Sequence, residues 1–294
     1  MRGDGETFHH QTYSLSRRKL ESLEYLYGPV KELVRFTVCE TIPTTTEAGY
    51  DGYLITSPSG EPQFPTTGFL GYEHKNKAHI QAAIPYEDLS EHLLEVNEAF
   101  APKLAENMYR CNFSTEVKIA DDGNNYFIDL TARAPEPPGS IMMEQIENLG
   151  EFMYHGAAGE LREIELEKPF GVQVMLYSSW AKTNWQTFDI PDDIRRWVKV
   201  YNSFYADGAT HAAPREISNP YSDGNDEVGS VVGLGDTIQE AIDNVREYCG
   251  ELKAFDTDDQ IEALGECLKR IHAGEEEGVE FPGKTPKPST IIED

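Results

Sequence analysis

Two carboxylates on either side of a short polar turn are the residues of this chain best placed for chemistry. Glu116 lies within residues 113–120 and Asp129 near the end of residues 126–130, and both runs have the composition of β-strands. Residues 121–125, Asp-Asp-Gly-Asn-Asn, favour a tight reversal because Gly and Asn tolerate positive φ. The stretch is therefore predicted to be a β-hairpin that carries both acids.

Both acids have apolar or β-branched neighbours, where an unpaired carboxylate is costly to desolvate. Mg²⁺ would compensate them, because it prefers oxygen ligands and commonly takes one or two carboxylates together with phosphate oxygens. Thr131 and Arg133 follow Asp129 at alternate positions, so the three share a face as long as the strand continues. The alternative is a solvated hairpin with acids on its outer face.

The hairpin resembles the metal-binding hairpin of ATP-grasp ligases. A Glu on one strand is followed on the next by an aromatic residue, Ile, an acid, a small polar residue and Arg. The usual family form is Glu-x-Asn-x-Arg, and here Asp129 stands for Glu and Thr131 for Asn. The resemblance implies that Glu116, Asp129 and Thr131 hold Mg²⁺ against the phosphates of ATP. It also implies that Arg133 faces an acyl-phosphate or a substrate carboxylate.

The first residues are a second candidate site, because a glycine-rich chain brings backbone N–H groups close to phosphate oxygens. Gly3, Gly5 and Thr7 lie in this polar run, which resembles the loop that folds over the triphosphate in ATP-grasp proteins. A flexible chain end is the alternative. In the family, a strand with an ATP-contacting lysine precedes this loop. The resemblance therefore implies a shortened or split protein, or a complementing N-terminal chain without which turnover is slow.

A third set of candidates follows the apolar run 34–40. Glu40, Ile42 and Glu47 resemble the ATP-grasp hinge, in which backbone groups at Glu40 and Ile42 would face adenine and Glu47 would accept hydrogen bonds from ribose. Farther along, Lys75 follows a loop rich in Pro, Thr and Gly and is a candidate for contact with an anionic substrate or a phosphate. An exposed lysine is the alternative there.

The elements that must position these residues follow from hydrophobic spacing and from turn and cap signals. Helices are predicted over residues 14–27, over 86–110 with an interruption at Pro102, over 140–156 with Ser140 as N-cap, from about 238 to 248, and from about 256 to 272. Further strands are predicted over 34–40, 50–55, 171–177, 197–204 and 229–234, with Asp51-Gly52 as a turn signal.

The pattern predicts an α+β fold: an ATP-grasp-like nucleotide-binding lobe, incomplete at its N-terminus, followed by a smaller C-terminal α/β subdomain. The strand, Gly-Asp-Thr turn and helix around residues 229–248 resemble the C-terminal part of phosphoribosylamine–glycine ligases. We expect the lobe over residues 1–157, the subdomain over 158–273 and an acidic, Pro-containing tail over 274–294.

Composition narrows the class of partner. The formal charge of −27, from 52 acidic and 25 basic residues, argues against nucleic-acid binding, which needs clustered Lys and Arg. No apolar run has membrane-spanning length, and the N-terminus lacks a signal-peptide core. The four cysteines lack metal-site spacing and are expected as core thiols. A protein of the reducing cytoplasm, without membrane contact, fits these features.

Together these features predict an ATP- and Mg²⁺-dependent ligase that joins a small-molecule carboxylate to an amine, or to a thiol, through an acyl-phosphate, releasing ADP and phosphate. One alternative is a catalytically inactive ATP-grasp scaffold that binds nucleotide. Another is a hydrolase in which Glu116 and Asp129 act as acid and base. A sugar-cleaving cleft, however, would be lined by aromatic residues without a basic residue such as Arg133 beside the acids.

Overall fold

The computed structural model describes residues 13–33, 42, 46–120, 124–215 and 226–291. The chain divides into two compact units, Met1–Thr41 and Ile42–Asp294. The described part of the first unit is helix α1 (Tyr13–Tyr27), which confirms the predicted helix, and a 3₁₀ turn, η1 (Gly28–Leu33). Gly28 has φ +47°, a conformation that Gly adopts at little cost, and it ends the helix.

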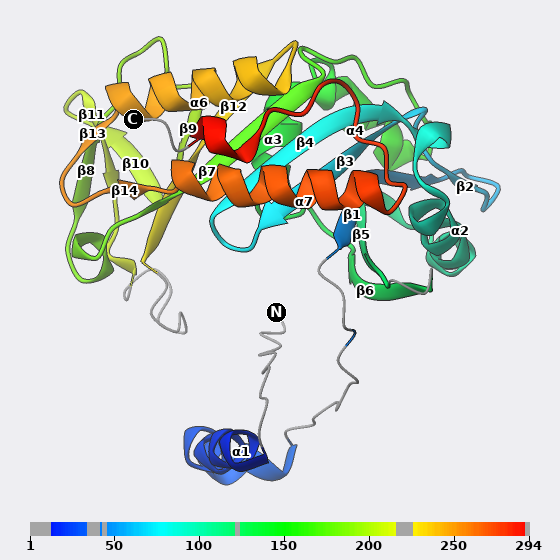
Figure 1. The fold of residues 1–294 in the computed structure, drawn as a ribbon, viewed down its shortest axis with the longest axis horizontal. Coiled ribbons are helices and arrows are strands. Elements are labelled where there is room, and N and C mark those ends of the chain that lie inside the picture. The colour runs from blue at the N-terminus through cyan, green and yellow to red at the C-terminus, as the bar shows by residue number, and fades with distance from the viewer. Residues whose placement is uncertain (1–12, 34–41, 43–45, 121–123, 216–225, 292–294) are drawn as a thin grey trace. The chain divides into compact units, whose positions relative to one another are not determined.

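The second unit alternates antiparallel strands with helices that cover them (Figure 1). Its first part contains β1 (Glu47–Thr56), β2 (Pro62–Gln63), β3 (Thr67–His74), β4 (Ala78–Pro85), η2 (Tyr86–Asp88), α2 (Glu91–Ala105), β5 (Arg110–Ile119), β6 (Asn125–Thr131), α3 (Pro138–Gln145), α4 (Leu149–Ala158) and β7 (Phe170–Tyr177). Its second part contains η3 (Trp180–Lys182), β8 (Gln186–Asp189), β9 (Val198–Val200), β10 (Ser203–Ala206), β11 (Ala209–Ala212), β12 (Glu227–Gly235), α6 (Ile238–Glu251), β13 (Lys253–Ala254), β14 (Asp258–Asp259), η4 (Ile261–Ala263), α7 (Leu264–Glu276) and η5 (Pro288–Ile291).

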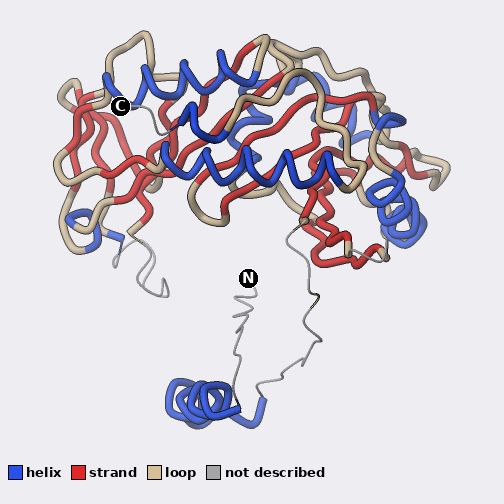
Figure 2. The backbone as a smooth tube through the Cα atoms, in the orientation of Figure 1, coloured by secondary structure: helices blue, strands red, loops and turns tan. Residues whose placement is uncertain are grey.

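Among the described residues, the strands form two sheets (Figure 2). The larger sheet has the order β6-β5-β1-β3-β4-β7-β12-β9, with β2 and β14 paired at its margins, and the smaller has the order β10-β11-β8-β13. The predicted hairpin is confirmed, because β5 and β6 pair directly and lie at one edge of the larger sheet. The predicted boundary near residue 157 falls within the second unit, where β7 pairs with β4 in one sheet.

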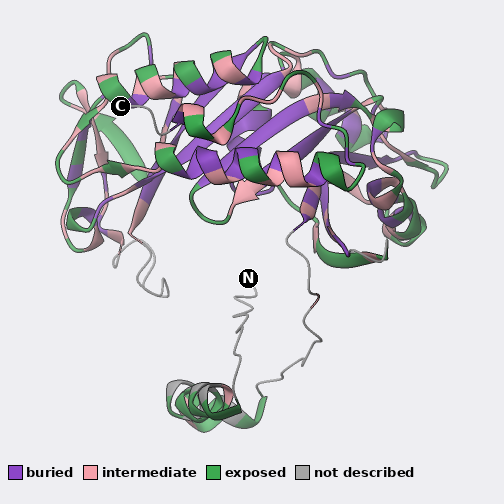
Figure 3. Ribbon diagram, viewed as in Figure 1, coloured by how far each residue is buried: buried purple, intermediate pink, exposed green. Residues whose placement is uncertain are grey.

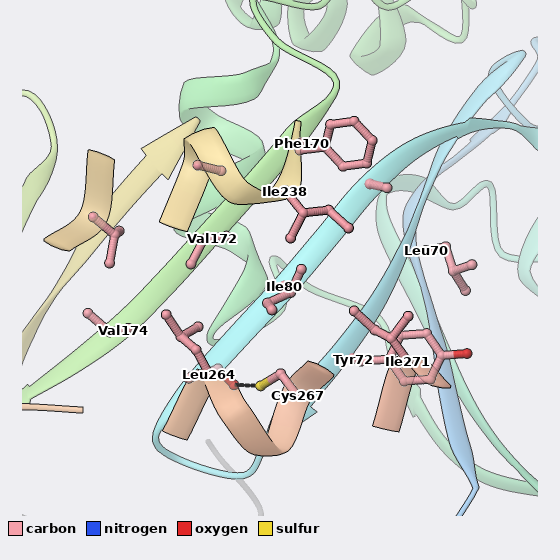
Figure 4. Packing of buried hydrophobic residues seen from close by; sticks show 14 of the residues in the cluster. Leu70, Tyr72, Ile80, Phe170, Val172, Val174, Ile238, Leu264, Cys267 and Ile271 are labelled. Atoms are coloured by element: carbon pink, nitrogen blue, oxygen red, sulfur yellow. Dashed lines mark hydrogen bonds between the residues drawn. The ribbon is translucent and has the colours of Figure 1, made fainter. Parts of the chain in front are cut away.

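One face of the larger sheet is apolar and is covered by α6 and α7. Alternate side chains of β3, β4 and β7, among them Tyr72, Ile80 and Val172, pack there against Ile238 and Leu264 (Figure 4). Both helices turn buried sides toward the strands and exposed sides toward solvent (Figure 3). Burial of this apolar area supplies the main stabilisation of the unit, at roughly 25 cal/mol per Å².

The opposite face of the same strands is polar toward β5 and β6 and apolar farther along. There Tyr53 of β1 and Phe69 of β3 pack under Met142 of α3 and Phe152 of α4. The close approach of α3 depends on Gly171, where an added Cβ would lie 2.1 Å from Ile141 Cγ2. The acids therefore lie on the face opposite to α6 and α7.

Three expected elements differ from the structure. Helix α2 continues through Pro102 to Ala105, since Ala101 and Ala105 are buried against the core and packing outweighs the missing hydrogen bond. The helix expected over 140–156 is divided into α3 and α4, because Ile146 bridges to Leu166 in between. Ser140 is not an N-cap, because α3 already begins at Pro138.

Two further expectations are also corrected. The strand expected over 197–204 is split into β9 and β10, which belong to different sheets, because Asn202 between them has φ +48°. The last helix begins at Leu264 rather than near residue 256. Beyond it, Val279, Phe281 and Ile291 are buried, so the C-terminal tail packs on the unit.

Two thiols are confirmed as core residues, because Cys249 and Cys267 are free and buried. The Cys267 thiol donates to the Ala78 carbonyl at 3.4 Å (Figure 4). Cys111 is half-buried, and Cys39 lies outside the described residues. Across the part of the chain that the structure describes, no helix has the length and apolarity needed to cross a membrane.

Candidate functional site

Glu116 and Asp129 are directly opposite each other on β5 and β6. The Glu116 side chain is partly buried and that of Asp129 is exposed. A β-bulge begins at this pair, since the next paired residues are Val117 and Phe127 and Ile128 is left over. The structure thus places the two predicted metal ligands side by side on one face of a two-stranded edge.

Thr131 contacts the acid pair, whereas Arg133 lies beyond the end of strand β6. The Thr131 hydroxyl donates to the Asp129 carboxylate at 3.2 Å, so the two are neighbours as predicted. Strand β6 ends at Thr131, so strand alternation does not extend to Arg133. The Arg133 side chain is exposed and donates through Nη1 to the Ala134 carbonyl at 2.8 Å.

Three more acids lie on the face of Glu116, because the register of β1, β3 and β5 brings them there. Gly49 of β1 is opposite Glu116 on one side and Gly71 of β3 on the other. Alternate positions then place Glu47, Asp51 and Glu73 on that same face. Only Glu47 among them was a candidate from sequence. Asp51 was predicted in a turn, whereas it lies within β1, and the alternation of β1 about Asp51 is the signal that could have identified it.

Burial and mutual repulsion change the acidity of this cluster. Burial, with the negative charges of Glu73 and Glu47, raises the pKa of Glu116 to about 7. Burial also raises the pKa of Asp51 to about 7, and the charge of Glu116 adds to that effect. Burial likewise raises the pKa of Glu73. Burial and mutual repulsion therefore make these three carboxyls weaker acids than they would be in water.

Lys75, Lys118 and Arg270 carry positive charges near these acids, and the charge of Arg270 lowers the pKa of Glu73. Lys75 lies in the turn between β3 and β4, is exposed, and lowers the pKa values of Glu73 and Glu116 by its positive charge. Lys118 Nζ lies 3.8 Å from Glu47 Oε2. The structure thus brings the predicted Lys75 to the acid pair, although the two are about 40 residues apart in sequence.

A histidine that sequence analysis did not single out lies beside the cluster. His79 Nε2 is 4.0 Å from Asp51 Oδ2, and both side chains are more than nine-tenths buried. Burial lowers the pKa of His79 to about 3, so its imidazole is neutral at physiological pH. Gly71 makes room for this ring, because a Cβ there would lie 2.4 Å from Nε2.

The other expected nucleotide contacts are only partly described. Gly3, Gly5, Thr7 and Glu40 lie outside the described residues. Ile42 is described, is half-buried and belongs to no helix or strand. Glu47 begins β1 near the acid pair.

The arrangement fits a hard cation that takes part of its coordination shell from water and phosphate oxygens rather than from the protein. The described residues contain no group of three His, Cys, Asp or Glu side chains positioned as a metal centre. Glu116 and Asp129 would supply two carboxylates, and Mg²⁺ commonly completes its octahedron with water and phosphate oxygens. Burial, with the charges of Glu73 and Glu47, raises the pKa of Glu116 to about 7, and a divalent cation bound there would favour its ionised form.

Comparison with solved structures decides the fold. Phosphoribosylamine–glycine ligase from Thermotoga maritima superposes with a TM-score of 0.58 at 14% identity, over 83% of this chain and 62% of that one. The chain has the ATP-grasp fold. The biotin carboxylase domain of 2-oxoglutarate carboxylase from Hydrogenobacter thermophilus, solved with MgADP and bicarbonate, superposes with a TM-score of 0.51 at 12% identity. That match covers 90% of this chain and 57% of the other.

The predicted α+β fold class and the ATP-grasp resemblance are thereby confirmed. The chain spans about three-fifths of the length of these two ATP-grasp structures. No family model matches the sequence, and no curated protein does. Because identities of 12–14% establish the fold alone, activity and substrates are argued separately below.

Proposed function

We propose that this ATP-grasp protein is an ATP- and Mg²⁺-dependent ligase. It would activate a small-molecule carboxylate as an acyl-phosphate and join it to an amine or a thiol, releasing ADP and phosphate. The observation that carries the proposal is the pairing of Glu116 with Asp129 across neighbouring strands of an ATP-grasp fold. The MgADP in the Hydrogenobacter structure supports the choice of nucleotide and metal.

Glu116, Asp129 and Thr131 would hold the metal in this proposal. Two carboxylates beside each other provide the oxygen ligands, and a bound cation would favour the ionised form of Glu116, whose pKa is raised to about 7 by burial. When bound, Mg²⁺ neutralises charge on the transferring phosphoryl group. The Thr131 hydroxyl, which donates to Asp129, orients that carboxylate.

Arg133 and Lys75 would act on the substrate side. Arg133 presents a planar fork that can pair with a carboxylate or phosphate at two points. Lys75 is exposed and its positive charge lowers the pKa of Glu116, so its ammonium would stabilise negative charge on a phosphoryl group bound there. Both residues stabilise negative charge electrostatically, which is the main contribution a protein makes to phosphoryl transfer.

The nucleotide would be bound by two further groups. The backbone amides of Gly3 and Gly5, with the Thr7 hydroxyl, would hold phosphate oxygens. Backbone groups of Glu40 and Ile42 would face adenine, and Glu47 would accept from the ribose hydroxyls.

A second candidate function is nucleotide binding without catalysis. Two observations favour it: Thr131 occupies the position where ATP-grasp ligases have Asn, and β6 ends before Arg133. Such a scaffold would bind Mg-ATP through the acid pair and release no ADP.

Titration and turnover separate these functions. ATP binding is measured by calorimetry with Mg²⁺ and with EDTA, and ADP release is then measured across a panel of carboxylates and amines. Carboxylate-dependent ADP release supports the ligase, and Mg²⁺-dependent binding without ADP supports the scaffold. AMP as product would reject the acyl-phosphate route, and equal ATP affinity with and without Mg²⁺ would reject the metal role.

A further inference from the structure

The segment that carries Arg133 connects the end of β6 to the start of α3, over residues 132–137. It belongs to no helix or strand, and its Arg133 side chain bonds to the neighbouring Ala134 carbonyl. A segment of this kind fixes a side chain only if it is held from outside, because each free residue retains backbone entropy.

A tyrosine from a distant part of the chain holds this segment. Tyr201 Oη donates to Glu136 Oε1 at 2.6 Å, across 65 residues of sequence. Tyr201 itself is anchored, because it directly follows β9 and its backbone N–H donates to the Val228 carbonyl at 2.9 Å. Burial, together with the negative charge of Glu136, raises the pKa of Tyr201 well above its ordinary value, so the hydroxyl keeps its proton.

Helix α3, which follows this segment, is tied at its far end to the same part of the chain as Tyr201. Glu144, near the end of α3, accepts from Arg196 Nε at 2.5 Å and pairs with Lys199. The Glu144 side chain is only 12% exposed, whereas Arg196 is 50% exposed, so solvent screens these ion pairs in part. Residues 196–201 thus make contacts on both sides of the start of α3. Arg196 and Lys199 pair with Glu144 inside the helix, and Tyr201 bonds to Glu136 just before it.

We propose that Tyr201 is a positioning residue for Arg133. Its hydrogen bond to Glu136 restrains residues 132–137, the segment that carries the Arg133 guanidinium. The role rests on the proposed ligase function, in which Arg133 meets a carboxylate or phosphate. Restraint before binding removes an entropy cost that would otherwise be paid at the transition state.

Trypsin offers a test that does not need a known substrate, because it cleaves after Arg133 only when this segment opens to fit the protease. Tyr201→Phe removes the hydroxyl and keeps the ring. We expect it to raise cleavage at Arg133–Ala134 at least tenfold, while cleavage at the exposed Arg162 changes less than twofold. Tyr205→Phe, on the exposed strand β10, is the matched control and should leave both rates unchanged.

Two variants of Glu136 distinguish loss of the Tyr201–Glu136 hydrogen bond from global destabilisation of the protein. Glu136→Ala should reproduce the effect of Tyr201→Phe, whereas Glu136→Gln retains an acceptor oxygen and should stay within about threefold of wild type. Cleavage of Tyr201→Phe at the wild-type rate would overturn the proposal. So would an equal rise at Arg133 and Arg162, which would indicate global destabilisation.

Turnover gives the second readout. With a carboxylate and amine that support ADP release, Tyr201→Phe should lower kcat at least tenfold and change KM for ATP less than twofold, whereas Glu136→Gln alone should keep kcat within about threefold of wild type. An unchanged kcat would reject the positioning role. Wild-type protein that releases no ADP with any substrate would instead reject the ligase function, while the trypsin comparison would still decide whether Tyr201 restrains the Arg133 segment.

Discussion

Asp129 and Phe127 lie on opposite faces of β6, although they are two residues apart and a regular strand would place them on the same face. The bulge at Ile128 produces this arrangement, because Asp129 pairs with Glu116 and Phe127 pairs with Val117. Phe127 can therefore pack against Phe100 of α2, with ring centroids 4.8 Å apart, while Asp129 joins the acids on the other face. One irregularity lets the hairpin both pack against α2 and contribute an acid to the site.

Asp129→Ala should lower the affinity for ATP in the presence of Mg²⁺ at least tenfold, or roughly 1.4 kcal/mol. The reason is that Glu116 alone would remain as a single carboxylate ligand. Calorimetric titration with and without Mg²⁺ measures the effect. Asp193→Ala, at an exposed position next to the smaller sheet, is the matched control. Unchanged Mg²⁺-dependent affinity in Asp129→Ala would reject the metal role.

Thr131→Asn should leave nucleotide binding intact or improve it. An amide carbonyl is a stronger oxygen ligand than a hydroxyl, and the substitution restores the residue usual in ATP-grasp ligases. The same titration tests this expectation. A tenfold loss of affinity would show that the hydroxyl bonded to Asp129 is required as it stands.

Arg133→Lys should reduce turnover steeply while the Kd for ATP stays within about twofold. Lysine keeps the charge but loses the planar fork that pairs with a carboxylate or phosphate at two points. Single-turnover ADP formation and equilibrium ATP binding measure the two quantities separately. Arg162→Lys, at an exposed position paired with Glu160, serves as control. Parallel losses in binding and turnover would place Arg133 on the nucleotide instead.

The free energy of unfolding should fall as pH rises toward neutrality. Asp51→Asn should make that fall smaller. Burial raises the pKa of Asp51 from 3.8 to about 7, so the folded protein binds this proton more tightly than the unfolded chain. The associated stabilisation is complete below the unfolded pKa and is lost as pH rises through the folded pKa. Urea unfolding at about pH 5 and about pH 8 should show a difference of roughly 1–3 kcal/mol that the variant reduces. The exposed Asp193→Asn is the control, and equal slopes in all three proteins would contradict the prediction.

Gly71→Ala should destabilise the protein by roughly 1–3 kcal/mol, because a buried site would be overpacked. The added Cβ would lie 2.4 Å from His79 Nε2 and 3.4 Å from Asp51 Oδ2. Gly250→Ala is the matched control, since nothing lies within 4 Å of its added Cβ and α6 should gain roughly 0.5–1 kcal/mol. Urea midpoints of the two variants measure the contrast. A neutral Gly71→Ala would mean that the His79 ring does not occupy this space.

The sequence alone determined the hairpin and its two acids. Alternating residues on either side of a Gly-Asn turn define strand pairing within some twenty residues, so Glu116 and Asp129 could be placed together from local information. The strand-to-helix turn at Thr237 was equally local, and the Thr237 side chain does cap α6 by accepting from the Glu240 N–H at 3.1 Å.

Only the tertiary structure decided which other residues join that pair. Asp51, Glu73 and His79 reach the site through the pairing of β5 with β1, of β1 with β3, and of β3 with β4, and local periodicity does not encode the register between separate segments. Local sequence also does not predict the bond of Tyr201 to Glu136, which spans 65 residues. Nor does it predict that α2 continues through Pro102, because core packing stabilises the helix there. Each of these outcomes depends on contacts between distant segments, which form only once the whole sheet is assembled.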